Sequence, residues 1–218
     1  STGNSALALG NGTSASYAFT LAAGYNAQAS SQFGATALTN SYASGSYSLA
    51  AAIANNTSSY GAAGANSVAI GATVKASASK STAIGGLNNI ASGSYSIVAG
   101  GGYNSSTGTY SFSAGQSNVA AGSYSTIIGG RSNETTASAA YSVASGYQSV
   151  ASIQGQIAHA SGRFSSDGDA QTGTLVLRSD TTDATAEALT TNNSTAGTTN
   201  QVILPNNSAF AFSGTIVA

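Results

Sequence analysis

The side chains that could perform acid–base chemistry are few and lie mostly in the last quarter of the sequence. The chain contains six Asp and Glu residues, five Lys and Arg residues and one histidine. Cleavage of a glycosidic bond, a natural activity for a protein that meets surface sugars, needs two carboxyl groups at a set separation. No carboxylate precedes Glu134, so any catalytic pair must come from Asp167, Asp169, Asp180, Asp183 and Glu187.

The sequence contexts of these groups favour a structural role over a catalytic one. Asp167 and Asp169 flank a glycine, and Asp183 follows two threonines, as is typical of turns and caps. The single histidine, His159, has no nucleophile and orienting acid around it in a recognisable pattern, so no Ser-His-Asp triad is predicted. One histidine without cysteine does not make a typical metal site, and no twelve-residue Asp-rich calcium loop occurs. We therefore expect no enzyme activity, no metal and no cofactor.

The composition is unlike that of an ordinary globular enzyme. Apolar residues make up 41% of the chain but are mostly alanine, only 5% of residues are charged, and the net charge is −1. Low charge and low complexity also occur in disordered linkers, but the regular placement of Val, Ile, Phe and Tyr and the single proline favour a folded chain. Five basic residues form no patch for nucleic acid or an anionic membrane, and no apolar run predicts membrane insertion. We expect a soluble segment whose stability comes from packing, repetition or oligomerisation.

One short pattern, a serine followed by a strand-like core and a glycine, recurs along the chain. Its closing glycines are Gly71, Gly85, Gly100, Gly115, Gly129 and Gly146, separated by 14, 15, 15, 14 and 17 residues. An earlier copy spans Ser5 to Gly10 and leads to Gly24, and an insertion is expected around Tyr60 to Gly64. This period is too short for helical pairs and fits two short strands and two turns, which is one coil of a parallel β-roll or β-solenoid.

Stacked coils lie about 4.8 Å apart, so ten or so coils predict a rod roughly 50 Å long. Glycine suits the corners because a tight turn needs positive φ or close backbone approach. Asparagine tolerates the left-handed conformation, so we expect corner positions for Asn66, Asn88, Asn104, Asn118 and Asn133.

The strand-like cores are apolar on both faces. One side reads Val68/Ile70, Thr82/Ile84, Ile97/Ala99, Phe112/Ala114 and Thr126/Ile128, and the other reads Ala69, Ala83, Val98, Ser113 and Ile127. Such strands are typically covered on both faces. One face can fill the interior of the roll, and the other then needs a neighbour. A homotrimer around a shared axis explains this best.

The tyrosines follow the same period. Those directly before the core serine are Tyr47, Tyr95, Tyr110, Tyr124 and Tyr141. A column of surface tyrosines could face a receptor, although periodic aromatic residues in a solenoid more often form stacked ladders. These five are the candidate site residues, as ladder or as receptor-facing surface.

The segment Asn66-Ser67-Val68-Ala69-Ile70-Gly71, with Val74, Ala76, Ala78 and Ser81-Thr82-Ala83-Ile84-Gly85, resembles the head repeat of trimeric autotransporter adhesins. The resemblance covers roughly residues 4–152. It implies a left-handed parallel β-roll, three tightly wrapped chains, and binding to host matrix or cell surfaces. The same type of roll also occurs in phage tail fibres.

The composition changes after residue 150, so we divide the chain into a repeat β-roll at 1–162 and a β-rich module at 163–218, which we expect to be incomplete. Thr174 to Arg178 and Phe210 to Val217 alternate as antiparallel strands do, with a Thr/Asn-rich loop at 190–200 between them. The segments Gly168-Asp169-Ala170-Gln171 and Ala211-Phe212-Ser213-Gly214 look like the start of a module that recurs in phage tail-fibre proteins. We expect the natural chain to continue beyond Ala218.

These observations lead to a hypothesis about function. The chain is expected to be a structural and host-receptor-contacting segment of a trimeric phage tail fibre, located in the virion tail. Its expected partners are two further copies of itself, a host cell-surface glycan or protein, and other virion tail proteins. The alternative is a head fragment of a bacterial trimeric autotransporter adhesin on the outer cell surface. Ice binding is disfavoured because no coil carries regular Thr-x-Thr columns.

Overall fold

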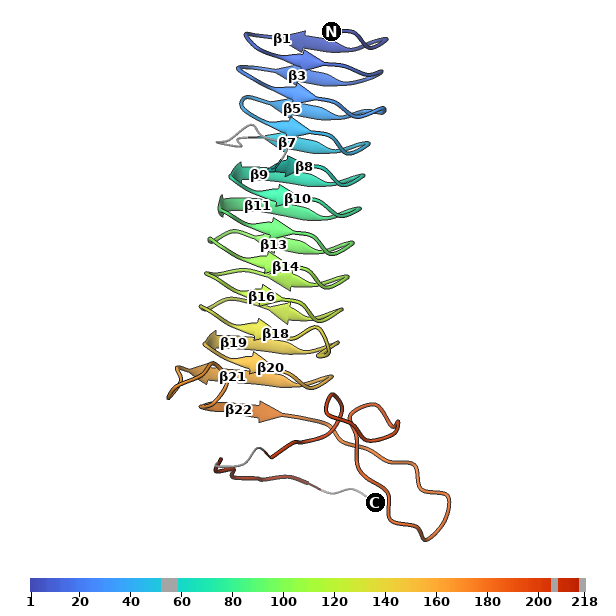
Figure 1. Ribbon diagram of the computed structural model, residues 1–218, viewed down its shortest axis with the longest axis vertical. Coiled ribbons are helices and arrows are strands. Elements are labelled where there is room, and N and C mark those ends of the chain that lie inside the picture. Colours follow the sequence, from blue (N-terminus) through green and yellow to red (C-terminus); the bar gives the residue numbers. More distant parts are fainter. Residues whose placement is uncertain (52–58, 205–207, 216–218) are drawn as a thin grey trace.

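The chain folds into a tall stack of short coils with an irregular segment at one end (Figure 1). The computed structural model describes residues 1–51, 59–204 and 208–215, and within these ranges the regular structure is entirely β, without a helix. Each coil gives one strand to each of two parallel sheets, and about ten coils are stacked. The predicted all-β parallel solenoid is therefore confirmed.

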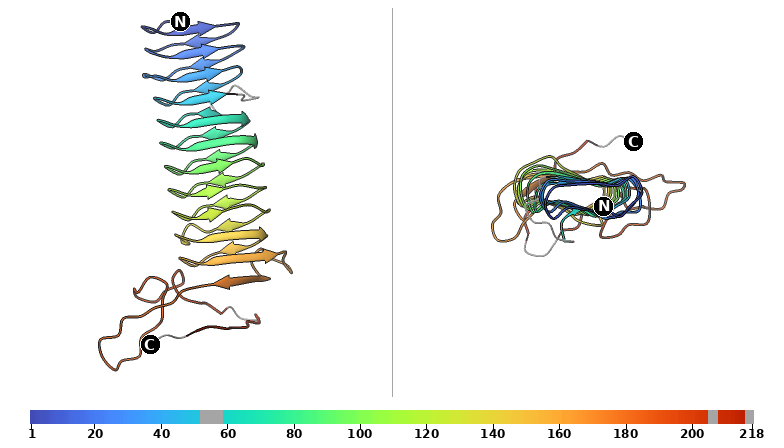
Figure 2. Two further views of the ribbon diagram at one scale, coloured as in Figure 1. Left: turned by 180° about the vertical axis from the view of Figure 1, so that it is seen from behind. Right: turned by 90° about the horizontal axis from the view of Figure 1, so that it is seen from above.

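The two sheets run along opposite sides of the stack. In the described residues the first sheet has twelve strands, in the order β1 (Leu7–Leu9), β3 (Leu21–Ala23), β5 (Thr36–Leu38), β7 (Leu49–Ala51), β9 (Val68–Ala72), β11 (Thr82–Leu87), β13 (Ile97–Ala99), β15 (Phe112–Ser113), β17 (Thr126–Ile127), β19 (Val143–Tyr147), β21 (Ile157–Ser161) and β22 (Gln171–Thr174). The second sheet has ten, in the order β2 (Ser14–Ala15), β4 (Gln28–Ala29), β6 (Tyr42–Ala43), β8 (Gly61–Ala62), β10 (Lys75–Ala76), β12 (Ile90–Ala91), β14 (Ser105–Ser106), β16 (Val119–Ala120), β18 (Glu134–Thr135) and β20 (Val150–Ala151). Seen along the stack, the coils superpose as one flattened ring (Figure 2).

The register of the sheets follows the sequence repeat. In the first sheet Val68 pairs with Thr82, Thr82 with Ile97, and Ile97 with Phe112, which are steps of 14, 15 and 15 residues. The step from Leu49 to Val68 is longer, at 19 residues. The insertion was expected around Tyr60 to Gly64, but Gly61 and Ala62 pair in normal register with Lys75 and Ala76. The extra residues therefore lie between β7 and β8.

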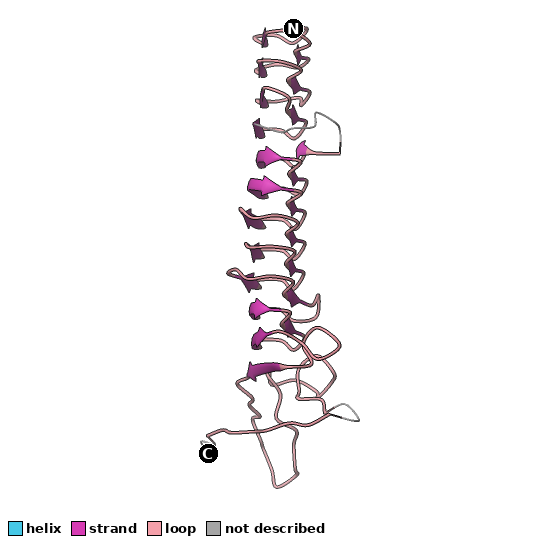
Figure 3. Cartoon of the chain, turned by 90° about the vertical axis from the view of Figure 1, so that its left-hand side faces the viewer, coloured by secondary structure: helices cyan, strands magenta, loops and turns pink. Residues whose placement is uncertain are grey.

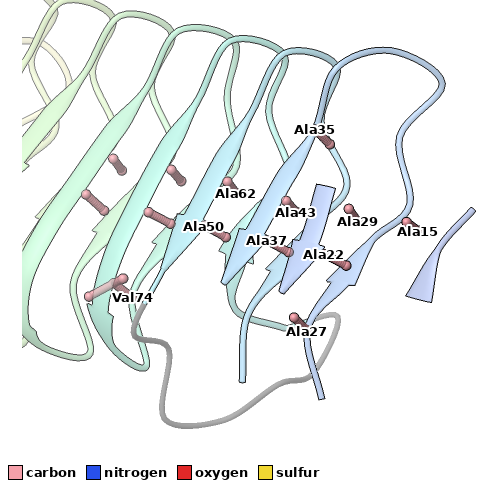
Figure 4. Packing of buried hydrophobic residues seen from close by; sticks show 14 of the residues in the cluster. Ala15, Ala22, Ala27, Ala29, Ala35, Ala37, Ala43, Ala50, Ala62 and Val74 are labelled. Carbon is pink, nitrogen blue, oxygen red and sulfur yellow. The ribbon is translucent and has the colours of Figure 1, made fainter. Parts of the chain in front are cut away.

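The interior of the roll is thin and is filled mainly by alanine (Figure 4). The second residue of each strand points inward. In the first sheet the fully buried inward residues are Ala22, Ala37, Ala50, Ala69, Ala83, Val98, Ser113, Ile127, Ala144 and Ala158. In the second sheet Ala29, Ala43, Ala62, Ala76, Ala91, Ala120 and Ala151 face them. Where Ser106 and Ser113 replace alanine, their hydroxyls bond each other at 2.8 Å, so neither buried oxygen lacks a partner.

The corner before the first sheet has one conformation in every coil. Its residue has a left-handed backbone, with φ between 56° and 59° at Phe19, Tyr47, Asn66, Lys80 and the four later tyrosines. The buried serine that follows closes the turn in several coils by donating its hydroxyl to the carbonyl three residues earlier, as Ser125 does to Gly122 at 2.6 Å. This turn directs the preceding side chain outward.

The corner before the second sheet differs from the prediction for asparagine. Asn88 at this corner does have positive φ, as does Asn66 at the corner before the first sheet, but Asn104, Asn118 and Asn133 do not. These three join Asn89 in a buried column, and the positive φ lies one residue earlier, at Tyr103, Ser117 and Ser132. Each Oδ1 accepts the backbone N–H of the next residue in the column, for example Asn104 N to Asn89 Oδ1 at 3.0 Å. Asparagine is selected here for its amide group, because only that group can satisfy the corner carbonyls and the next N–H together.

The C-terminal segment closes one end of the roll (Figures 1 and 3). Strand β22 pairs antiparallel with β21, the last parallel strand of the first sheet. On the second sheet the amide of Gln171 takes the place of a strand: its Oε1 accepts Val150 N–H and its Nε2 donates to Val150 O, both at 2.8 Å. The ladder of backbone groups at this end is thereby covered on both sheets.

The strands predicted in the C-terminal segment are only partly present. The observed strand β22 ends at Thr174, so only the first residue of the strand predicted at 174–178 is in a strand. Arg178 forms a single antiparallel bridge, to Thr190. Residues 210–215, the described part of the strand predicted at 210–217, have no regular structure, and 216–218 lie outside the described residues. The alternation of apolar and polar residues did not suffice to predict this strand, because a strand also needs a partner to pair with. In the described part of the chain no strand pairs with this segment.

Candidate functional site: the tyrosine ladder and the apolar sheet face

Four of the five candidate tyrosines form one continuous stack, here called the tyrosine ladder: Tyr95, Tyr110, Tyr124 and Tyr141. Their neighbouring ring centroids are 4.6, 5.0 and 5.0 Å apart, and their planes are within 14° of parallel. The rings stack because all four residues occupy the same outward corner of successive coils. The parallel pairing of the strands sets the spacing between rings.

Tyr47 belongs to the same column but lies outside the ladder. Its ring stacks on Phe33 at 6.3 Å, and Asn66 and Lys80 occupy the two positions between Tyr47 and Tyr95. The five candidate residues therefore share one type of corner, and four of them are brought together.

Lys80 covers the N-terminal end of the ladder. Its ammonium lies 4.6 Å from the ring centroid of Tyr95, and Nζ donates a hydrogen bond to the Tyr95 hydroxyl at 2.6 Å. This hydrogen bond, with the positive charge, lowers the pKa of Tyr95 and raises the pKa of Lys80. Sequence reasoning missed Lys80, although it stands directly before Ser81 just as each tyrosine stands before its serine. Aligning that one position across the coils would have found it.

The ladder offers a row of phenol hydroxyls and ring edges along the rod. The ring faces within the stack are covered by their neighbours, so the ladder cannot act as a row of open stacking platforms. Exposure rises along it, from 40% at Tyr95 to 60% at Tyr141. The arrangement is suited to weak, repeated contacts with a surface.

The outer face of the first sheet is a second candidate surface, here called the apolar face. Its large side chains are Leu7, Leu9, Leu21, Leu38, Leu49, Val68, Ile70, Ile84, Ile97, Phe112, Ile128, Val143 and Ile157. Ile84, Ile97 and Ile128 are 44%, 42% and 69% exposed. No outward residue in its described strands from Leu7 to Ile157 is charged, whereas the outer face of the second sheet includes Lys75 and Glu134. An exposed apolar surface of this length is typical of faces that contact another molecule.

A shallow groove of about 390 Å³ lies beside the second sheet. It is lined by Tyr60, Thr73, Asn88, Ile90, Tyr103, Asn104 and Ser105. Thr73 Oγ1 donates to Asn88 Oδ1 at 2.5 Å, so these two polar side chains of the lining bond each other. The groove contains no ionisable group other than its tyrosines.

The ionisable residues considered for catalysis lie in turns of the C-terminal segment or at its edge. Asp169 accepts backbone N–H groups from Ser166, Ser165 and Phe164 at 2.7 to 2.8 Å, and these bonds lower the pKa of its carboxyl. Asp183 closes a turn with Thr185, whose hydrogen bonds lower the Asp183 pKa.

Two further acidic side chains are also paired, and the backbone N–H of Asp180 donates to Asn193 Oδ1 at 3.0 Å. Asp167 pairs with Arg163 at 2.6 Å, and Glu187 accepts from Ser179 at 2.8 Å. His159 Nδ1 lies 3.0 Å from Ser145 Oγ on the outer side of the first sheet. Within the described ranges, no three His, Asp or Glu side chains are close enough together to hold a metal ion.

No helix in the described ranges has the length and apolar character required to span a membrane. The chain matches no model of a known protein family, and no curated protein matches it as a relative.

Proposed function

We propose that this chain is a structural and receptor-contacting segment of a trimeric phage tail fibre. The observation that carries the proposal is the apolar face, which runs along the rod from Leu7 to Ile157 without a charge. In a single chain this face is exposed to water, at a cost of about 25 cal/mol for each Å² of apolar surface. Three copies packed around one axis would cover it in all three chains at once.

The rod shape and the repeat support the same function. A stack of about ten coils spans roughly 50 Å, and its length is set by the number of coils. The resemblance to adhesin head repeats and to tail-fibre modules gives the biological context. In a trimer, the tyrosine ladder would be present three times, so weak contacts with a host glycan or protein would add through avidity.

A second candidate is a head fragment of a trimeric autotransporter adhesin on a bacterial surface. The segment from Asn66 to Gly85 favours it, because it carries the head-repeat motif and folds into two successive coils in register. The two candidates share the trimer and the surface contact. They differ in where the rod would be located, which is the virion tail for the fibre and the bacterial outer surface for the adhesin.

Light scattering on the purified chain tests the trimer. The expected mass is three times the chain mass of 21.0 kDa. Ile97→Asp puts a charge on the apolar face and should reduce the mass to that of one chain. Val119→Asp is the matched control, because Val119 has similar exposure on the outer face of the second sheet, and its mass should stay trimeric. A folded monomer for the unmodified chain would overturn the proposal.

A further inference from the structure

The C-terminal end of the tyrosine ladder differs from every other position in the stack. Tyr110 and Tyr124 have a tyrosine on both ring faces, and Tyr95 lies between Lys80 and Tyr110. Tyr141 stacks on Tyr124 on one side alone. Within the described residues, Tyr141 is therefore the ladder tyrosine that has one ring face uncovered.

The face of Tyr141 is open because the next coil has glycine at the same corner. Gly155 N donates to Ala140 O at 2.9 Å, which places Gly155 in register with Tyr141. Gly155 has φ +73°, close to the 56–59° of the tyrosine corners, and a Cβ atom built on it would meet nothing within 4 Å. The position has the backbone of a ladder residue and space beside it, but no side chain.

Polar groups border this position on one side. Gln154 precedes Gly155, and its backbone N–H donates to Thr199 O at 2.9 Å, so the loop at 190–200 is attached beside the last corner. Asn192 Nδ2 donates to Gln154 Oε1 at 3.1 Å. The open aromatic face thus lies beside a corner whose preceding residue has an amide side chain held by the loop at 190–200.

We propose that a pyranose ring binds on the open face of Tyr141, in the space over Gly155, and so continues the ladder by one ring. A pyranose has a flat face of C–H bonds, which the negative face of an aromatic ring attracts, and a rim of hydroxyls that suits amide donors. The neutral surroundings fit an uncharged sugar. The inference rests on the proposed role in surface contact, and it identifies the contacted group as a hexose unit of a glycan.

The test uses the purified chain in its native assembly and saturation-transfer NMR with oligosaccharides of glucose, galactose and N-acetylglucosamine. We expect at least one of the three to bind. Gly155→Tyr should weaken that binding about tenfold or more, because the new ring would occupy the space over Gly155, and five tyrosines already adopt this backbone in the chain. Tyr141→Ala should have the same effect. Tyr47→Ala, a change at the same corner type outside the ladder, should leave binding unchanged.

The outcomes separate this inference from the proposed function. Absence of binding by the unmodified chain, or equal binding by Gly155→Tyr, overturns the sugar site even if the chain is trimeric and attaches to cells. Conversely, sugar binding that Gly155→Tyr removes would support the site even if the trimer proposal fails. Circular dichroism of each variant checks that the roll is intact. Binding of an aromatic peptide but of no oligosaccharide would also overturn the proposal.

Discussion

The coils before Gly85 and the coils after it share one pattern of parallel pairing but differ inside and at both corners. Alanine alone fills the inward positions of the described strands before Gly85, whereas half of these positions after it hold other residues, namely Val98, Ser106, Ser113, Ile127 and Thr135. Before the second sheet, the earlier coils have Ala27, Ser41 and Val74, where the later coils have the asparagine column from Asn89 to Asn133. Before the first sheet, the earlier coils have a mixture of side chains, where the later coils have the tyrosine ladder. The later half therefore has two continuous side-chain ladders in addition to its backbone bonds.

This difference shows that the fold does not require the ladders. Parallel pairing and alanine packing hold the earlier coils in the same register. Because each coil contacts mainly its neighbours, stability along a solenoid is close to a sum of coil and interface terms. The later half should accordingly resist local opening more strongly than the earlier half. Hydrogen exchange along the chain would measure that gradient.

Replacing an asparagine of the buried column should have the largest effect. Asn104→Val leaves the Asn118 N–H without a partner and removes one of two hydrogen bonds from each of the carbonyls of Gly100 and Gly115. At about 1–3 kcal/mol for the unpaired buried N–H and about 1 kcal/mol for each lost hydrogen bond, the expected loss is about 4 kcal/mol. Thermal unfolding followed by circular dichroism measures it.

The reciprocal change, Val74→Asn, should cost less than about 1.5 kcal/mol, since the new amide would face Asn89 and extend the column by one position. A smaller loss for Val74→Asn than for Asn104→Val would show that the asparagine side chains, and not the corner backbone, make the difference between the halves. Equal losses for the two substitutions would show instead that the column has no special weight.

A glycine pair beside the same column should show the next largest effect. Gly100 and Gly101 have nearly equal φ, 74° and 72°, so a change to alanine strains both backbones by a similar amount, about 1–2 kcal/mol. A Cβ at Gly101 would also lie 1.7 Å from the carbonyl oxygen of Gly115 and 3.1 Å from Asn104 Nδ2, whereas one at Gly100 meets nothing within 4 Å. Gly101→Ala should therefore cost about 2 kcal/mol more than Gly100→Ala. Chemical denaturation of the two variants measures this difference in the free energy of unfolding. Indistinguishable denaturation midpoints would contradict the close packing of this corner.

The contrast between the halves also shows what the sequence can and cannot predict. The period of the closing glycines predicts the coil, and the alternation around Ala69 and Ala83 predicts two distinct strand faces, because both depend on local geometry. The role of Asn104 could not be predicted from its tolerance of positive φ. Its buried amide is explained by carbonyls of the next coil, 11 residues away in sequence, and only the stacked structure brings these groups together.

The candidate site was predictable in part for the same reason. The tyrosines share one position in the repeat, so their common corner follows from the sequence. Lys80 and Gly155 occupy that position without being aromatic, and they mark the two ends of the ladder. The strands predicted near 174–178 and 210–217 lie outside the repeat, where no neighbouring coil fixes the pairing.

The contribution of ring stacking should be smaller than that of the asparagine column. Tyr110→Ala and Tyr47→Ala change the same type of corner, with φ of 58° and 56°, so the backbone effect cancels between them. Tyr110 loses two ring contacts, at 4.6 and 5.0 Å, and Tyr47 loses one, at 6.3 Å. Tyr110→Ala should therefore cost about 1 kcal/mol more than Tyr47→Ala. A smaller loss for Tyr110 than for Tyr47, in paired thermal melts, would mean that the ladder follows from the fold without stabilising it.

The smallest effect concerns the Lys80 end of the ladder and appears as a titration. The ammonium of Lys80 stabilises the ionised form of Tyr95 through the 2.6 Å hydrogen bond, so the pKa of Tyr95 is lowered. In Lys80→Met the ultraviolet absorbance of tyrosinate should therefore begin at a higher pH than in the unmodified chain. Tyr95→Phe should remove the same part of the titration, because it deletes the phenol whose pKa is lowered. Identical onsets in Lys80→Met and the unmodified chain would contradict the contact.

The sign of the linked effect on folding follows from the same pair. A raised lysine pKa contributes stability that is fully present below the ordinary lysine pKa and is lost as the pH rises through the folded value. A lowered tyrosine pKa favours the folded state once the pH exceeds that folded pKa. Between these two values Lys80 and Tyr95 form an ion pair, so this end of the ladder should be held most firmly in mildly alkaline solution.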